Sequence, residues 1–333
     1  MKPLLASLLF AATCCHAQVV VPKPPWASGG SGTSKPAQPP AAKAPEQPAP
    51  EPSTTIRVNV KLVNVFVTVT DDHGAPVGGL TKDNFQLSED GAPQKIAVFD
   101  KESALPLSIA LDVDTSLSTR RDLPLELASA RRFVHAILRP VDALSLYQFS
   151  EVVDQVTPFT SDLQRIDRAI DRVHLGSATA LYDALYLSSQ ALERRQGRKV
   201  LVVITDGGDT ISQVNYQDAL REAQEAEALV YSIIIVPIEA SAGRDTGGEH
   251  ALIQLSEDTG GRYFYATSAP QLDNAFRQIS DELRTQYLLA YYPLQRFSGS
   301  DYRRIDVKVQ GPPDADTLKV RHRTGYYTTK SDF

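Results

Sequence analysis

The chain has 333 residues, of which 42% are hydrophobic and 22% charged, so it can form one large domain or two smaller ones with buried cores. Its formal net charge is -6, and no stripe of basic residues is visible in the sequence. Nucleic acids and anionic membranes attract clusters of Lys and Arg, so composition argues against both as partners.

Residues 1–17 have the three regions of a secretory signal peptide. Lys2 precedes the apolar run Leu4–Ala12, and small residues follow up to Ala17, where we expect cleavage. The run is shorter than the roughly 20 residues that a transmembrane helix needs, and no later segment predicts a transmembrane segment. We therefore expect an exported protein that is periplasmic, associated with the envelope or secreted.

Both cysteines, Cys14 and Cys15, lie inside this leader, so the mature chain is expected to have no disulfide and no cysteine metal site. A lipid anchor is the alternative, but Thr13 before Cys14 fits such a signal poorly. Residues 18–54 are rich in Pro, Ala and Lys and lack apolar periodicity, which predicts a disordered linker.

Residues 55–103 alternate between apolar and polar positions, which indicates β-strands. We expect a small antiparallel sheet here, with strands at residues 56–69, Phe85–Ser88 and Ile96–Phe99. Residues 284–333 return to the same pattern. Their predicted strands are Gln286–Tyr292, Arg304–Val309 and Leu318–Arg323. The two flanks are expected to pack together as one accessory antiparallel β unit.

Residues 104–283 alternate short apolar strands with amphipathic helices, which predicts an α/β domain with a mostly parallel sheet flanked by helices. The expected strands are Leu107–Ala110, Asp142–Phe149, Lys199–Thr205, Val230–Val236 and Tyr263–Ala266. The expected helices are Leu123–Leu138, Asp162–Val173, Ala180–Arg195, Tyr216–Ala228, His250–Glu257 and Pro270–Leu283. Open sheets of this kind bind ligands at the carboxyl ends of their strands.

Oxygen-bearing side chains follow two of these strands and begin one helix. Asp114, Ser116 and Ser118 lie two residues apart directly after the first strand. Thr179 lies on a loop of small residues that opens a helix, and Asp206 follows the strand that ends at Thr205. Carboxylate and hydroxyl oxygens are hard ligands that suit Mg²⁺, Mn²⁺ or Ca²⁺.

These three segments resemble the metal-ion-dependent adhesion site of von Willebrand factor type A domains. The order of the Asp-x-Ser-x-Ser loop, the distant threonine and the strand-end aspartate is the same, and the resemblance covers residues 104–283. With the flanking segments Tyr287–Pro293 and Val320–Tyr327, the mature chain looks like a bacterial family related to this domain and best known from acidobacteria.

The resemblance implies that Ser116 and Ser118 ligate a divalent cation directly, and that Asp114, Thr179 and Asp206 do so directly or through water. A cation with two carboxylates nearby is under-neutralised and attracts an acidic group from a partner. The resemblance therefore implies a cation-dependent protein-binding module, for adhesion or assembly, with no catalytic residues. Leu117 stands where glycine is common in such sites, and Ser177–Ala178 where a glycine pair is common, but neither change removes a ligand.

Two alternatives stay open at this point. The segment Asp112–Ser116 also resembles the first motif of haloacid-dehalogenase-type phosphatases, in which Asp112 would be the nucleophile. Asp206 and Asp209 would then form the acidic metal-binding motif, although no convincing lysine follows a strand at the expected place. The other alternative is a structural envelope scaffold in which a metal ion only stiffens the loops.

Overall fold

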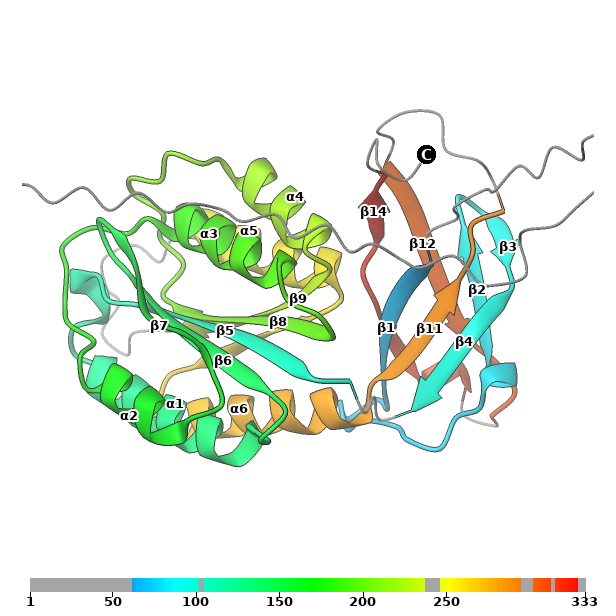
Figure 1. Ribbon diagram of the computed structural model, residues 1–333, viewed down its shortest axis with the longest axis horizontal. Helices are drawn as coiled ribbons and strands as arrows, with labels where there is room; N and C mark the ends of the chain where they lie inside the picture. Colours follow the sequence, from blue (N-terminus) through cyan, green and yellow to red (C-terminus); the bar gives the residue numbers. More distant parts are fainter. Residues whose placement is uncertain (1–61, 102–104, 237–245, 295–301, 313–314, 329–333) are drawn as a thin grey trace, which may run out of the picture. The chain divides into compact units, whose positions relative to one another are not determined.

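The computed structural model describes residues 62–101, 105–236, 246–294, 302–312 and 315–328. The predicted signal peptide and linker lie outside these described residues. Figure 1 shows a mixed sheet covered by helices. It also shows two antiparallel sheets, which are formed by the segments before and after this α/β part of the chain. None of the helices in the described ranges combines the length and apolarity that a membrane crossing requires.

The central sheet has six strands in the order β10-β9-β8-β5-β6-β7. Its strands are β5 (Leu107–Asp114), β6 (Ala143–Phe149), β7 (Val153–Thr160), β8 (Arg198–Thr205), β9 (Ala228–Ile235) and β10 (Arg262–Ala266). Neighbours are parallel except β7, which runs antiparallel to β6. β5, β6 and β9 are buried along their whole length, as apolar strands covered on both faces must be.

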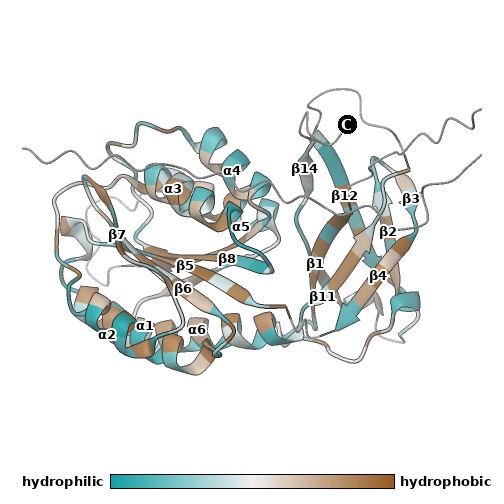
Figure 2. Ribbon diagram, viewed as in Figure 1, coloured by the Kyte–Doolittle hydropathy of each residue, from teal (hydrophilic) through white to brown (hydrophobic). Residues whose placement is uncertain are grey.

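Helices cover both faces of this sheet (Figure 1). One face packs against α1 (Leu123–Ile137), α2 (Leu163–Ile170) and α6 (Ala269–Thr285). The other packs against α3 (Leu181–Glu193), α4 (Tyr216–Glu225) and α5 (Thr246–Thr259). Figure 2 shows hydrophobic and hydrophilic residues alternating around α1 and α2, as expected for helices that bury one side. The predicted α/β fold class is confirmed.

The segments before and after the α/β domain pair with each other in two four-stranded sheets. The first contains β13 (Lys319–Arg321), β1 (Val63–Thr70), β11 (Tyr287–Tyr291) and β4 (Ile96–Lys101) in that order. The second contains β14 (Gly325–Tyr327), β12 (Tyr302–Val309), β2 (Phe85–Glu89) and β3 (Ala92–Gln94). The accessory antiparallel β unit is thus confirmed.

Two details of the strand prediction were wrong. The N-terminal strands do not form one sheet of their own, because β1 and β4 are separated by β11, and β2 pairs with β12. The edge strand β7 was not predicted, because its sequence carries two consecutive polar residues and Pro158 in place of a regular alternation. A proline is tolerated there since an edge strand leaves one row of N–H groups unpaired.

Candidate metal site

The carboxyl ends of β5 and β8 form the point where the order of strands reverses. The chain runs from β5 to β6 on one side, and later enters β8 on the other side of β5. Ligand sites of open α/β sheets lie in the crevice at such a point. Asp114 is the last residue of β5, and Thr205 at the end of β8 donates a 2.7 Å hydrogen bond to its carboxylate. Asp206, the next residue, therefore leaves the sheet beside Asp114.

The Asp-x-Ser-x-Ser loop is held in a tight turn by its own polar groups. The backbone N–H of Ser116 donates to the Asp114 carboxylate at 2.8 Å, and the Thr119 hydroxyl donates to the backbone carbonyls of Asp114 and Ser116. The Oγ atoms of Ser116 and Ser118 lie 2.9 Å apart. Two neutral hydroxyl oxygens are therefore presented side by side next to a carboxylate.

The loop that carries Thr179 is fastened to this turn. The N–H of Gly176 donates to the carbonyl of Thr115 at 2.8 Å, and the N–H of Ala180 donates to the carbonyl of Ser150 at 2.7 Å. A Cβ atom at Gly176 would lie 2.1 Å from the Ser150 Oγ, so the close approach requires glycine. Thr179 is thereby held near the end of the sheet, with 5% of its surface exposed.

The same loop is also fastened to the segment after β8. The N–H of Thr179 donates to the Thr210 hydroxyl, and the N–H of Thr210 donates back to the Thr179 carbonyl, both at 2.9 Å. The Asp209 carboxylate accepts from the N–H of Leu181 at 2.9 Å and so caps α3, whose own N-cap residue, Ala180, has no side chain able to do so. Asp209 therefore has a structural role.

The structure brings some of the predicted ligands into direct contact and places the others by their loops. Ser116 contacts both Asp114 and Ser118, whereas Thr179 and Asp206 lie on loops that are hydrogen-bonded around this turn. Asp114 and Ser116 are buried, Ser118 is exposed and Asp206 is partly exposed. The set of oxygens therefore opens toward solvent on the side of Ser118 and Asp206.

The site has an excess of negative charge. Burial raises the pKa of Asp114 to about 6, although hydrogen bonds from Thr205 and Ser116 oppose the shift, and the charge of Asp206 adds to it. An ionised carboxylate in such surroundings is unfavourable unless a positive charge lies nearby. A bound cation would supply that charge.

A further acidic residue of this region, Glu126, is not among the predicted ligands. It lies in the first turn of α1 and is 1% exposed, and in the described part of the chain neither of its carboxylate oxygens has a hydrogen-bond partner. Burial raises its pKa well above the usual value, and the charges of Asp114, Asp122 and Asp206 raise it further. Its place on the stripe that Leu123 begins is a weak sequence signal, because an acid in the first turn of a helix is also a common stabilising feature at an exposed position.

These residues fit a hard divalent cation. The donors are carboxylates and hydroxyls, which Mg²⁺, Mn²⁺ and Ca²⁺ prefer. Within the described ranges no group of three or more His, Cys, Asp or Glu side chains is arranged to hold a metal ion. An ion at this site would therefore depend on hydroxyl oxygens and water as well as on Asp114 and Asp206, an arrangement compatible with Mg²⁺, which keeps several of its waters.

The geometry gives the phosphatase alternative no support. Asp112 is 0% exposed and its side chain points toward α3, where Ser188 donates a 2.7 Å hydrogen bond to its carboxylate. Burial raises the pKa of Asp112 to about 8. A nucleophile has to reach a substrate, and this carboxylate is enclosed in the core between β5 and α3.

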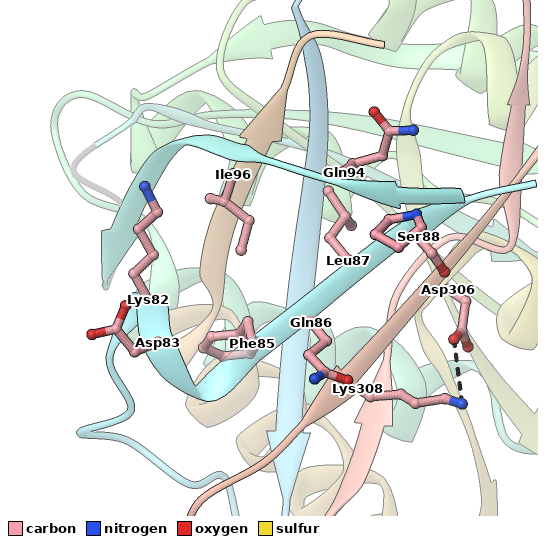
Figure 3. A pocket seen from close by; sticks show the side chains of 11 residues that line it. Lys82, Asp83, Phe85, Gln86, Leu87, Ser88, Gln94, Ile96, Asp306 and Lys308 are labelled. Carbon is pink, nitrogen blue, oxygen red and sulfur yellow. Dashed lines mark ion pairs between the residues drawn. The ribbon is translucent and has the colours of Figure 1, made fainter. Parts of the chain in front are cut away.

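A separate hollow of about 540 Å³ lies in the β unit (Figure 3). Apolar side chains of β2 and β4 form part of its wall, and Lys82, Asp83, Asp306 and Lys308 lie at its rim. Lys308 and Asp306 form an ion pair at 3.8 Å, and both side chains are mostly exposed. The hollow contains none of the predicted ligands and combines charges of both signs, so it indicates no particular ligand.

Residues 109–208 match the sequence model of the von Willebrand factor type A domain. The matched region begins in β5, ends shortly after β8 and includes all of the predicted ligands. This region is therefore similar to a von Willebrand factor A domain, as its motifs indicated. No curated protein matches the chain.

Several solved structures are similar to this chain at low identity. The protein BatB from Bacteroides thetaiotaomicron is 19% identical with a TM-score of 0.44, and the match covers 54% of this chain and 100% of that one. The vWF domain of the type V pili tip protein Mfa5 from Porphyromonas gingivalis is 13% identical with a TM-score of 0.44, over 54% of this chain and 95% of that one. A von Willebrand factor type A protein from Catenulispora acidiphila is 10% identical with a TM-score of 0.47, over 80% and 74%. Site assignments for this chain therefore depend on its own residues.

Proposed function

We propose that this protein is an exported binding module that uses a divalent cation, Mg²⁺ or else Mn²⁺ or Ca²⁺, to capture an acidic group of a protein partner. The observation that carries the proposal is the pair of hydroxyls of Ser116 and Ser118, whose Oγ atoms lie 2.9 Å apart beside the buried Asp114. They lie where the order of strands in the central sheet reverses, which is where such sheets bind ligands. The signal-peptide pattern of residues 1–17 supports export.

Each residue of the set has a part in this proposal. Ser116 and Ser118 offer neutral oxygens as ligands, and Asp114 supplies charge from beneath them. Thr179 and Asp206 complete the set directly or through water. When bound among so many neutral oxygens, the cation supplies an electrophilic centre that attracts a carboxylate. Ser118 and Asp206 are the members that solvent reaches, so a partner's carboxylate would approach from their side.

Exposed apolar side chains beside the site support a protein as the partner. Leu117, between the two serines, is 57% exposed, and Ile211, whose N–H contacts the Thr179 carbonyl, is 45% exposed. Apolar contacts around a central polar interaction are typical of protein interfaces. The departure from glycine at position 117 would therefore shape the partner surface while leaving the ligands in place.

Titration calorimetry with Mg²⁺ and Mn²⁺ on the wild type and on Asp114→Ala tests the metal site. We expect binding to the wild type and loss of binding in the variant. Capture of proteins from the envelope fraction of the source, with Mg²⁺ or with chelator, then tests docking. A protein counts as a partner when its capture requires Mg²⁺, Asp114 and a particular Asp or Glu of its own.

The scaffold alternative predicts a different combination of results. If the metal ion only stiffens the loops, Mg²⁺ raises the melting temperature of the wild type, but no protein is captured in a way that depends on Mg²⁺ and Asp114. A wild-type chain that binds neither Mg²⁺ nor Mn²⁺ contradicts both the docking proposal and the scaffold alternative.

A further inference from the structure

Glu126 occupies a position in α1 that the helix pattern reserves for an apolar side chain. The buried residues of α1 form one stripe, which consists of Leu123, Glu126, Ser129, Ala130, Phe133, Val134 and Ile137. Most of these side chains belong to the core between α1 and the central sheet. Glu126 is as buried as they are, with 1% exposed, yet it carries a carboxyl group.

The surroundings of Glu126 do not compensate a negative charge. Among the described residues, neither carboxylate oxygen finds a hydrogen-bond donor, and the charged groups that act on Glu126 are Asp114, Asp122 and Asp206. By comparison, the buried carboxylate of Glu282 in α6 is paired with Arg262 at 2.9 Å and with Arg321 at 2.7 Å. A buried acid without such a partner is unfavourable as an ion and is kept neutral unless a positive charge lies nearby, and a bound cation would supply that charge.

The start of α1 is fixed to the loop that carries the predicted ligands. The N–H of Asp122 donates a hydrogen bond to the carbonyl of Thr119 at 2.9 Å. The Thr119 hydroxyl in turn donates hydrogen bonds to the carbonyls of Asp114 and Ser116. The N–H of Glu126 donates to the Asp122 carbonyl at 3.0 Å. A chain of hydrogen bonds therefore sets the position of Glu126 relative to the Asp-x-Ser-x-Ser loop.

We propose that Glu126 is a third acidic group of the cation site, a positioning residue that acts on the bound ion from just outside its ligand shell. This inference rests on the proposed function. Direct ligation is not proposed, since Glu126 does not form a group of three metal-holding side chains with Asp114 and Asp206 in the described part of the chain. Outer residues of this kind commonly change metal affinity by about tenfold to a hundredfold.

The inference changes the charge of the site. Asp114 and Asp206 lie among the proposed ligands, whereas Glu126 adds its negative charge from outside the ligand shell, so the ion itself stays electrophilic toward a partner's carboxylate. Glu126 thus strengthens the retention of the ion in a site whose remaining donors are neutral hydroxyls. It acts through space and through water, so the charge matters more than the exact reach of the side chain.

The test measures Mn²⁺ affinity by the electron paramagnetic resonance signal of free Mn²⁺, in the full mature chain. We expect Glu126→Gln to weaken Mn²⁺ binding by about tenfold or more. Glu126→Asp, which keeps the charge, should retain most of the affinity. The matched control is Asp122→Asn, which removes one negative charge at the same helix end from a partly exposed position. We expect its Mn²⁺ affinity to change by less than about threefold, because solvent screens that charge.

The outcomes separate this inference from the proposed function. Equal Mn²⁺ affinity in the wild type and Glu126→Gln, or equal losses in Glu126→Gln and Asp122→Asn, would overturn the role of Glu126 and leave the metal site intact. Absence of Mn²⁺ binding to the wild type would overturn both. The melting temperature in chelator checks folding: Glu126→Gln should melt at or above the wild-type temperature, since a buried acid is replaced by a neutral amide. Should Glu126→Gln fail to fold, equal Mn²⁺ affinity in Glu126→Asp and Glu126→Ala would count against the inference.

Discussion

The two ends of β5 each bury a carboxylate, and the surroundings of the two carboxylates differ. At the amino end, Asp142 accepts hydrogen bonds from the N–H of Leu107, the first residue of β5, and from the backbone and guanidinium of Arg139. At the carboxyl end, Asp114 accepts hydrogen bonds from neutral donors, and the charged residues near it are acidic.

The pKa values record this difference. Burial alone would raise the pKa of Asp142, but the hydrogen bonds and charge of Arg139 and the N–H of Leu107 hold it below its ordinary value. Burial raises the pKa of Asp114 to about 6. Within the described residues, Arg139 therefore compensates the carboxylate at one end of the strand, and the charge that acts on Asp114 at the other end, that of Asp206, is negative. The first end is compensated within the fold, and the second is the end at which the proposed cation would bind.

Replacing Asp142 should have the largest effect. Asp142→Ala leaves the buried N–H of Leu107 without its acceptor and Arg139 without its partner, and we expect a loss of about 3 kcal/mol in the free energy of unfolding. Urea denaturation measures the loss, which should be the same with Mg²⁺ and with chelator. Glu225→Ala is the control, because it breaks the exposed Arg221–Glu225 pair and should cost less than about 0.5 kcal/mol.

Replacing Asp114 should give the reverse result. In chelator, Asp114→Asn should be at least as stable as the wild type at pH 7, since it removes a buried charge. With Mg²⁺ at a hundred times the dissociation constant, the wild type should gain about 2.7 kcal/mol and the variant nothing. Urea denaturation with and without Mg²⁺ measures both. A wild type that gains no stability from Mg²⁺ would remove the distinction between the two ends of β5.

The pattern of residues was sufficient to predict the architecture, and it gave the candidate ligand set, which stays a prediction. Apolar runs such as Val200–Ile204 can be satisfied only inside a sheet covered on both faces, and the residues that follow such strands lie at one edge. The order of Asp114, Thr179 and Asp206 along the chain then gave the resemblance. Because strand ends and helix starts are local features, they can be read without knowing the packing.

Features that depend on packing between distant segments could not be predicted in this way. Glu126 reads as an acid in the first turn of a helix, which is a common stabilising position, and only the packing of α1 on the sheet shows that it is buried. The separation of β1 from β2 into different sheets depends on pairing with β11 and β12, more than two hundred residues later in the chain. The capping of α3 by Asp209 likewise joins two loops.

The pH dependence of stability in chelator should have opposite signs at the two ends. The pKa of Asp142 is lowered in the fold, so its contribution is present above the unfolded value of 3.8 and is lost as the pH falls below it. The pKa of Asp114 is raised to about 6, so its burial cost is present in full above pH 6 and is relieved as the pH falls from 6 toward 3.8.

Urea denaturation at pH 7, 5 and 3 measures these contributions. The stability advantage of the wild type over Asp142→Ala should shrink between pH 5 and pH 3. The wild type should gain stability relative to Asp114→Asn between pH 7 and pH 5. If both differences changed in the same direction with pH, the assignment of one compensated and one uncompensated carboxylate to β5 would be wrong.

The smallest effect on the isolated protein, and the most selective test of docking, is expected from Leu117. This side chain is 57% exposed and lies between Ser116 and Ser118, so Leu117→Ser should change the free energy of unfolding by less than about 0.5 kcal/mol and leave Mg²⁺ affinity unchanged. Binding of a partner identified by Mg²⁺-dependent capture should weaken by at least about tenfold, since the apolar contact beside the cation is lost.

Val141→Ser, at a 62% exposed position that immediately precedes Asp142, is the control and should leave partner binding unchanged. Equal binding by the wild type and Leu117→Ser would place the partner's contact on the ion alone, and equal losses in both variants would remove the site from the interface.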